Sequence, residues 1–255
     1  MATQKNSNSR IIPANANRPD EGHFVVVYGK GGIGKTTTAC MAAHALLLDC
    51  GGGGREQRVD TWRIHTAADL GAAIEYLESQ PHPYRTVILD GVDALYLRTL
   101  KSDRDIRKAH KAAQDVILPL LARFSGLPIN RVLVLNERVF KEQQAVIEDG
   151  EKVWKTFADI SMNLSPKLSQ WVDDNCDLLI RAENTGRLDD DGNPTPTTIR
   201  VVRVTESQVN VQAKTRVDIV RNKMPLTQAL VNLGIIADHA APVEAEQPAL
   251  DLAGK

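Results

Sequence analysis

A glycine-rich segment near the N-terminal end has the residue types and the spacing that bind a triphosphate. It matches the pattern G-x-x-x-x-G-K-[ST], and glycines allow successive backbone N–H groups to point at one anion. We expect Lys35 to reach the β- and γ-phosphates and Thr37 to lie near the α-phosphate. The residues expected to surround the phosphates are consecutive: Gly29, Lys30, Gly31, Gly32, Ile33, Gly34, Lys35, Thr36 and Thr37.

Two oxygen-bearing side chains are predicted to hold Mg²⁺ beside these phosphates. The hydroxyl of Thr36 is expected to bind the ion directly. Asp90 follows the apolar residues 86–89 and is expected to hold the ion through water at the carboxyl end of a buried strand. The alternative for Asp90 is an aspartate that caps a helix or a turn.

Alternating apolar segments and amphipathic segments predict an α/β sandwich with a parallel core sheet and an antiparallel C-terminal extension. Residues 141–164 are mixed in charge and are expected to form a long irregular connection. A turn is expected at 188–193. The expected strands are 23–28, 58–64, 86–89, 131–135, 177–181, 198–204 and 208–213. The expected helices are 36–48, 66–79, 103–124 and a short one that begins at Pro166.

Composition favours one globular domain with polar tails. The chain has 255 residues and a net charge of −1, which excludes a strongly polybasic nucleic-acid binder. We expect disordered tails at 1–20 and 237–255 around a core at 21–236. Three cysteines without a C-x-x-C pair favour a reducing cytosol. No apolar run reaches membrane-spanning length and no signal core begins the chain, so neither secretion nor a membrane partner is expected.

Three segments resemble RecA-fold ATPases of bacteriophages, including the single-strand-annealing Sak group and the phage nucleotide-binding AAA-like proteins. They are residues 84–95 around Asp90, residues 132–138 with a strand that ends in Asn136-Glu137, and Lys214-x-Arg216 followed by Pro225. This resemblance, over about 23–235, implies a RecA-like sandwich that uses ATP and Mg²⁺ in DNA recombination or replication. It implies a ring or filament on single-stranded DNA in the bacterial host cytoplasm, with a single-strand-binding protein as a further partner.

The same resemblance implies roles for several residues in hydrolysis. Lys35 and Asp90 act on the nucleotide of their own subunit, while Lys214 and Arg216 reach the γ-phosphate held by a neighbouring subunit. Two solvated charges at a strand end are the alternative for this pair. Glu137 stands where RecA has glutamine, and either Glu137 or Asp93 is expected to orient the attacking water. We therefore expect slow hydrolysis that assembly or DNA stimulates.

A second resemblance gives an alternative function. Residues 30–38 resemble the deviant phosphate loop of the ParA/MinD/nitrogenase-iron-protein group, in which an early lysine, here Lys30, crosses a dimer interface. The chain departs from that group because residues 58–64 contain no Asp-Pro-Gln. A small-molecule kinase is a third possibility, against which the chain has no arginine-rich lid segment.

One stretch combines cations with aromatic residues and is a candidate surface for single-stranded nucleic acid. The alternative is a solvated loop whose aromatic residues pack on the core. Its members are Lys141, Lys152, Trp154, Lys155, Phe157 and Lys167.

Overall fold

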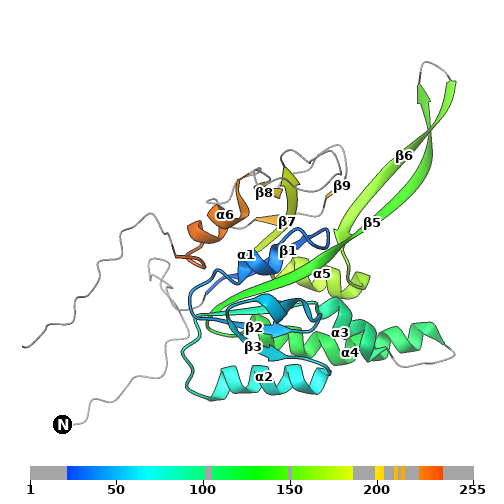
Figure 1. The fold of residues 1–255 in the computed structure, drawn as a ribbon. Coiled ribbons are helices and arrows are strands. Elements are labelled where there is room, and N and C mark those ends of the chain that lie inside the picture. Colours follow the sequence, from blue (N-terminus) through cyan, green and yellow to red (C-terminus); the bar gives the residue numbers. More distant parts are fainter. Residues whose placement is uncertain are drawn as a thin grey trace, which may run out of the picture.

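The computed structural model describes residues 22–100, 105–148, 151–185, 199–203, 210–211, 214–215 and 224–237. Their central sheet has the strand order β10-β7-β1-β5-β4-β2-β3 (Figure 1). All neighbours in this order are parallel except β10 and β7, which are antiparallel. The predicted α/β sandwich with a parallel core is therefore confirmed. The strands are β1 (Phe24–Gly29), β2 (Ala45–Asp49), β3 (Asp60–Arg63), β4 (Thr86–Asp90), β5 (Asn130–Glu148), β7 (Leu178–Thr185) and β10 (Lys214–Thr215).

Helices cover both faces of the sheet, which explains why its strands are apolar runs without alternation. Val26 and Tyr28 of β1 pack into one core cluster, and Val25 and Val27 pack into the other. The first cluster is covered by α2, α3, α4 and α5, and the second by α1 and α6. The helices are α1 (Lys35–Ala39), α2 (Ala67–Ser79), α3 (Val92–Thr99), α4 (Ile106–Ser125), α5 (Pro166–Asn175) and α6 (Leu226–Asn232).

The helix predicted over 36–48 is wrong beyond its first turn. The chain leaves the helix after Ala39, turns through His44 at φ 51°, and forms β2 over Ala45–Asp49. β2 lies between β4 and β3, and all of its residues are buried. Leucine and alanine favour helices, but burial between two strands overrides that preference here. The other helices predicted from periodicity are confirmed by α2, α4 and α5.

The irregular connection predicted over 141–164 is also wrong, because this region is a long β-hairpin. β5 continues past the sheet to Glu148 and pairs with antiparallel β6 (Glu151–Met162), in register from Glu137↔Met162 to Glu148↔Glu151. Figure 1 shows the hairpin projecting from the body of the molecule. We call β5 and β6 from Arg138 to Ser161 the arm. The sequence did not predict the two strands of the arm, because their mixed charge gives neither face the apolar alternation that is typical of a half-buried strand.

The C-terminal part adds strands at the β7 side of the sheet. β8 (Ile199–Arg203) pairs antiparallel with β7, which confirms the strand predicted at 198–204. Within the predicted strand 208–213, β9 (Asn210–Val211) pairs with β6. The turn predicted at 188–193, the tail 1–20 and residues 238–255 lie outside the described residues. None of the helices described is long and apolar enough to cross a bilayer.

Candidate functional site: a nucleotide pocket at the strand ends

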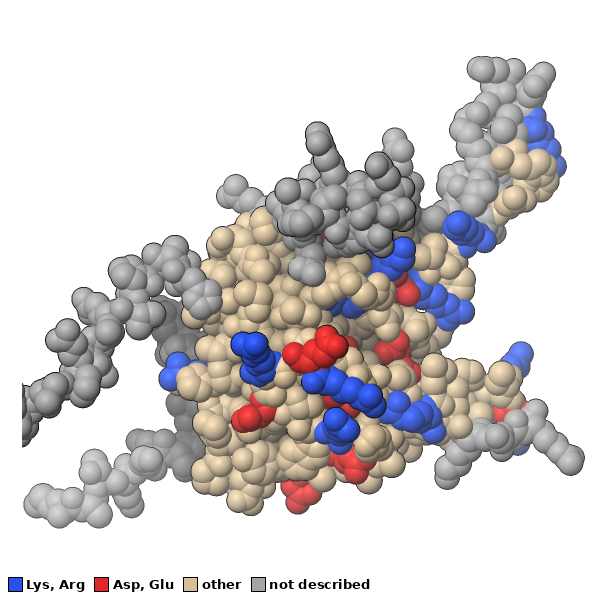
Figure 2. All heavy atoms as spheres, viewed as in Figure 1, with Lys and Arg blue, Asp and Glu red and all other residues tan. Residues whose placement is uncertain are grey.

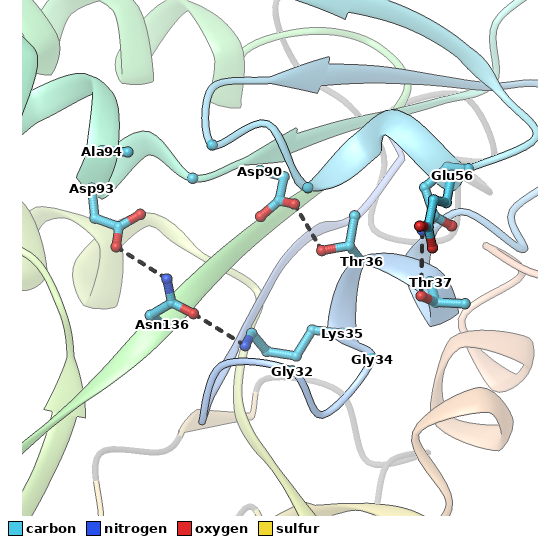
Figure 3. A pocket seen from close by; sticks show the side chains of 14 residues that line it. Gly32, Gly34, Lys35, Thr36, Thr37, Glu56, Asp90, Asp93, Ala94 and Asn136 are labelled. Atoms are coloured by element: carbon cyan, nitrogen blue, oxygen red, sulfur yellow. Dashed lines mark hydrogen bonds between the residues drawn. The ribbon is translucent and has the colours of Figure 1, made fainter.

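A cavity of about 460 Å³ opens where the carboxyl ends of β1 and β4 and the middle of β5, at Asn136, meet the loop that leads into α1 (Figure 3). Parallel strands present their loops at the same edge, which is where α/β folds bind ligands. The wall contains sequence-predicted phosphate-loop residues together with residues from three further segments. These are Gly32, Gly34, Lys35, Thr36, Thr37, Gly51, Gly53, Glu56, Gln57, Asp90, Gly91, Asp93, Ala94 and Asn136.

The loop adopts a conformation that requires glycine. Gly32 and Gly34 have φ of 78° and 82°, and Gly34 is the N-cap of α1. Gly29 has no room for a side chain, since a Cβ there would lie 2.3 Å from the carbonyl oxygen of Ala182 in β7. Ile33 anchors the loop in the core. Lys30 and Gly31 are exposed.

The lysine that is predicted to bind phosphate is buried in its own loop. Lys35 Nζ donates to the carbonyl oxygens of Gly29 (3.0 Å) and Lys30 (2.9 Å) and lies 3.5 Å from Asn136 Oδ1. Burial lowers the pKa of Lys35, although the nearby carboxylates, Asp90 first, oppose the shift. A triphosphate beside Lys35 would favour the charged ammonium, so this position suits an anion. α1 has only five residues. The loop amides and Lys35, rather than a long helix dipole, therefore supply most of the positive potential.

Thr36 and Asp90, the two predicted magnesium residues, are adjacent. Thr36 Oγ1 donates to Asp90 Oδ2 at 2.7 Å. Burial is the main reason why the pKa of Asp90 is raised, and a bound cation would offset that effect. Mg²⁺ is usually held by one or two protein oxygens together with phosphate oxygens and waters, and this hydroxyl–carboxylate pair fits that donor set. Within the described residues, no group of three or more His, Cys, Asp or Glu forms a separate metal site.

Asp49 is a site residue that the sequence did not identify. Its buried carboxylate accepts the N–H groups of Gly51 (3.1 Å), Gly52 (2.6 Å) and Gly54 (3.1 Å). It thereby fixes the segment from which Gly51 and Gly53 line the cavity. The signal was present, since an apolar run ends in Asp49 as it does at Asp90, and the glycines begin one residue further on, after Cys50. Because a helix was expected over 36–48, Asp49 was not recognised as a residue at the end of a strand.

The short 3₁₀ helix η1 (Gly53–Glu56) closes the end of the cavity beside Thr37. Glu56 and Gln57 line the cavity there, and Gln57 Nε2 donates to Thr37 Oγ1 at 3.4 Å. Because Thr37 is expected at the α-phosphate, we expect the nucleoside at this end of the cavity. Figure 3 shows Glu56 and Thr37 on one side of Asp90, with Asp93 and Asn136 on the other.

At the opposite end, Asp93 and two asparagines form a hydrogen-bonded group. Asp93 is 7% exposed and its Oδ2 accepts from Asn136 Nδ2 (3.4 Å) and Asn163 Nδ2 (3.2 Å). Asp93 Oδ1 is buried and has no hydrogen-bond partner. Asp93 also lines a second cavity of about 330 Å³, which it shares with Asn163 and Tyr96. Asp93 therefore lies between the two cavities.

The remaining predicted catalytic residues are not among the described residues that line the cavity. Glu137 Oε2 accepts from Arg181 Nε at 2.8 Å. Lys214 belongs to the edge strand β10 and pairs in register with Leu179 of β7, while its side chain lies outside what the structure describes. Arg216 lies entirely outside the described residues. The roles of these residues stay predictions.

A comparison with family models agrees with this geometry. The model described as "AAA domain" matches residues 21–217, which is more than half of the chain. None of the curated proteins compared with the chain matches it. Members of the matching family are P-loop ATPases that bind ATP with Mg²⁺. The loop, the lysine, and the threonine–aspartate pair described above are the parts that such a nucleotide requires. The chain belongs to the AAA-domain family of P-loop ATPases.

Proposed function

We propose that this protein is a Mg·ATP-dependent ATPase of phage type that acts on single-stranded DNA in recombination or replication. The observation that carries the proposal is the arm, because it continues the same strand that brings Asn136 into the nucleotide pocket. A DNA-binding element and a γ-phosphate contact on one strand would link nucleotide state to DNA binding.

The arm exposes large apolar and aromatic side chains that nothing in the described structure covers. Trp154 is 63% exposed and Ile147 is 68% exposed. The ammonium of Lys152 lies 5.1 Å from the Trp154 ring centroid, and the guanidinium of Arg138 lies 4.0 Å from that of Phe140. This exposure argues against aromatic residues that pack on the core. Exposed aromatic rings next to cations are what stacked bases and their phosphates require.

The register of the arm places its acidic residues on only one of its two rows. Residues directly opposite one another in a hairpin share a face, and neighbours along a strand alternate. One row of register positions, which we call the Trp154 row, contains no acidic residue. Its members are Val139, Lys141, Gln143, Ala145, Ile147, Lys152, Trp154, Thr156, Ala158 and Ile160.

The acidic residues of the arm occupy the alternate row, at Glu142, Glu148, Glu151 and Asp159. The register thus places Lys141 and Lys152 on the row without acidic residues, whereas Arg138 and Lys155 share the row of the acidic residues. Figure 2 shows blue side chains on the arm among its described atoms. A surface that combines cations with Trp154 suits a flexible polyanion with exposed bases.

We propose further that the protein assembles as a ring or filament and that hydrolysis depends on assembly. Lys214 and Arg216 would then meet the γ-phosphate of a neighbouring subunit. Cations at that position stabilise the charge that develops in phosphoryl transfer, and an arginine finger contributes ~10³–10⁵ in rate in other NTPases. Arg216→Ala should leave nucleotide affinity unchanged and reduce DNA-stimulated turnover, whereas unchanged turnover would remove this assignment.

The test of DNA binding is a fluorescence anisotropy titration of labelled oligothymidylate, with a slowly hydrolysed ATP analogue and over a range of salt concentrations. Trp154→Ala should weaken binding about 5- to 150-fold, since stacking contributes ~1–3 kcal/mol per base. Lys141→Ala with Lys152→Ala should lower the salt slope by about 1.4, at ~0.7 per phosphate contact on single strands. Lys111→Ala, at an exposed lysine on α4 outside the candidate surface, is the matched control.

Wild-type affinity in both arm variants would refute the arm as the DNA surface. Salt-insensitive or absent DNA binding by the wild-type protein would refute the proposed function. An isolated dimer that loses hydrolysis on Lys30→Ala would instead support the deviant-loop switch as the alternative.

A further inference from the structure

We propose that Asp93 is the catalytic carboxylate that orients the attacking water and accepts its proton. This inference rests on the ATPase part of the proposed function and not on DNA binding. The cavity wall contains three carboxylates, those of Glu56, Asp90 and Asp93. The position and the hydrogen bonds of each carboxylate indicate a different role for each.

The position of the γ-phosphate follows from the loop residues. Lys35 is expected to reach the β- and γ-phosphates, and its Nζ lies 3.5 Å from Asn136, which in turn donates to Asp93. Thr37, near the α-phosphate, is approached by Gln57. Asp93 therefore stands on the side expected for the γ-phosphate and Glu56 on the side expected for the nucleoside; Figure 3 shows the two carboxylates on opposite sides of Asp90.

The carboxylates of Asp90 and Glu137 already have hydrogen-bond partners. Asp90 accepts the Thr36 hydroxyl at 2.7 Å and belongs to the magnesium pair. Glu137 is held by Arg181 at 2.8 Å, and its side chain is not part of the cavity wall described above. Neither carboxylate is as well placed as Asp93 to receive a water that attacks the γ-phosphate.

Asp93 is held in a way that leaves one of its two carboxylate oxygens without a hydrogen-bond partner. Asn136 and Asn163 both donate to Oδ2, from β5 and from the segment after β6. Oδ1 is buried and unpartnered, and in Figure 3 it points toward the side where Asp90 and Thr36 lie. A buried carboxylate oxygen without a partner carries a desolvation cost of about 1–3 kcal/mol or more, which a bound water would relieve.

Water is the nucleophile in the proposed step. The water oxygen forms a bond to the γ-phosphorus while Asp93 Oδ1 takes one of its protons. The bond between the γ-phosphorus and the β,γ-bridging oxygen breaks, and its electron pair leaves on that oxygen as ADP. The proton is then released from Asp93 with the phosphate. Asn136 and Asn163 are positioning residues, since they act through the orientation of Asp93.

The test compares Asp93→Asn with Asp115→Asn, a matched control at an exposed position of α4. Asp93→Asn should lower kcat about 10²- to 10⁴-fold, the usual contribution of a positioned general base. Its Kd for ADP and for a slowly hydrolysed ATP analogue should change less than threefold, but its affinity for ADP with aluminium fluoride should fall at least tenfold. The control should match the wild type in all of these measurements.

Asn163→Ala removes one of the two donors to Oδ2 and serves as a second variant if Asp93→Asn does not fold. It should lower kcat about tenfold with unchanged ADP affinity. Wild-type turnover in both variants would overturn the inference. A large rise in the Mg²⁺ concentration needed for half-maximal nucleotide binding by Asp93→Asn would also overturn it, by making Asp93 a metal ligand. If the wild-type protein hydrolyses no ATP, the ATPase proposal fails together with this inference, whereas failed DNA binding leaves the inference standing.

Discussion

Replacing Asp49 tests whether one buried carboxylate builds the glycine segment of the pocket. Asp49→Ala removes the acceptor of three backbone N–H groups, those of Gly51, Gly52 and Gly54. Asp49 is only 4% exposed, and water does not easily replace the lost acceptor. Hydrogen bonds to charged groups contribute ~1.5–3 kcal/mol each and are not additive, so we expect a total loss of about 3–5 kcal/mol in unfolding free energy.

The matched variant Asp49→Asn keeps one acceptor. Its Oδ1 can still accept from Gly51 and Gly52, while an amide N–H₂ would face the N–H of Gly54. The expected cost is about 1–3 kcal/mol, that of one unsatisfied buried group. Asp115→Ala, at an exposed position of α4, should stay within about 0.5 kcal/mol of the wild type.

Two assays follow both parts of the reasoning. Urea denaturation measures the unfolding free energy directly. In thermal unfolding, the same loss in Asp49→Ala should lower Tm by roughly 6–20 °C, at ~2–4 °C per kcal/mol. Titration with a fluorescent ADP analogue should show weaker binding, since Gly51 and Gly53 line the cavity. An Asp49→Ala protein with wild-type stability and wild-type ADP affinity would refute the role given to this carboxylate.

Three further predictions concern the pocket and its surroundings. Burial raises the pKa of Asp90 above its ordinary 3.8, so the unfolding free energy falls as pH rises from 3.8 through the raised pKa of the folded protein. Asp90→Asn should therefore raise the Tm of the nucleotide-free protein at neutral pH and abolish stabilisation by Mg·ADP. A lower Tm in this variant would contradict the prediction. Gly29→Ala should cost at least ~1–3 kcal/mol because its Cβ meets Ala182 at 2.3 Å, whereas Gly31→Ala, with its nearest contact at 3.9 Å, should be tolerated. Burial raises the pKa of Cys50 to about 12, so this thiol should resist Ellman's reagent at pH 8 until the protein is unfolded, and rapid native-state labelling of Cys50 would refute its burial.

The sequence was sufficient where one local rule determined the structure. The phosphate loop needs glycines at fixed spacing, and Gly32 and Gly34 have the positive φ angles that this requirement implies. The helix α2 was predictable because Thr66 and Asp69 form a capping box before an apolar stripe. The buried strands β1 and β4 were predictable because their apolar runs end at residues with pocket chemistry.

The sequence was insufficient where tertiary contacts outweigh local preference. Residues 45–48 are good helix formers, yet burial between β3 and β4 makes them a strand and makes Asp49 a strand-end residue. Charged and polar residues occur along both strands of the arm, so its register could not be inferred from apolar alternation. Asp93 was one of two candidates for the same role, and its separation from Glu137 required the positions of Asn136, Asn163 and Arg181.

The most direct test of the central claim is isothermal titration calorimetry of Mg·ADP and of a slowly hydrolysed Mg·ATP analogue into the full chain. The wild-type protein should bind one nucleotide per chain. Lys35→Ala should weaken the ATP analogue more than ADP, and Thr36→Ala should remove the effect of Mg²⁺. Failure of the wild-type protein to bind either nucleotide, or binding that both substitutions leave unchanged, would contradict the assignment of this cavity as the nucleotide site.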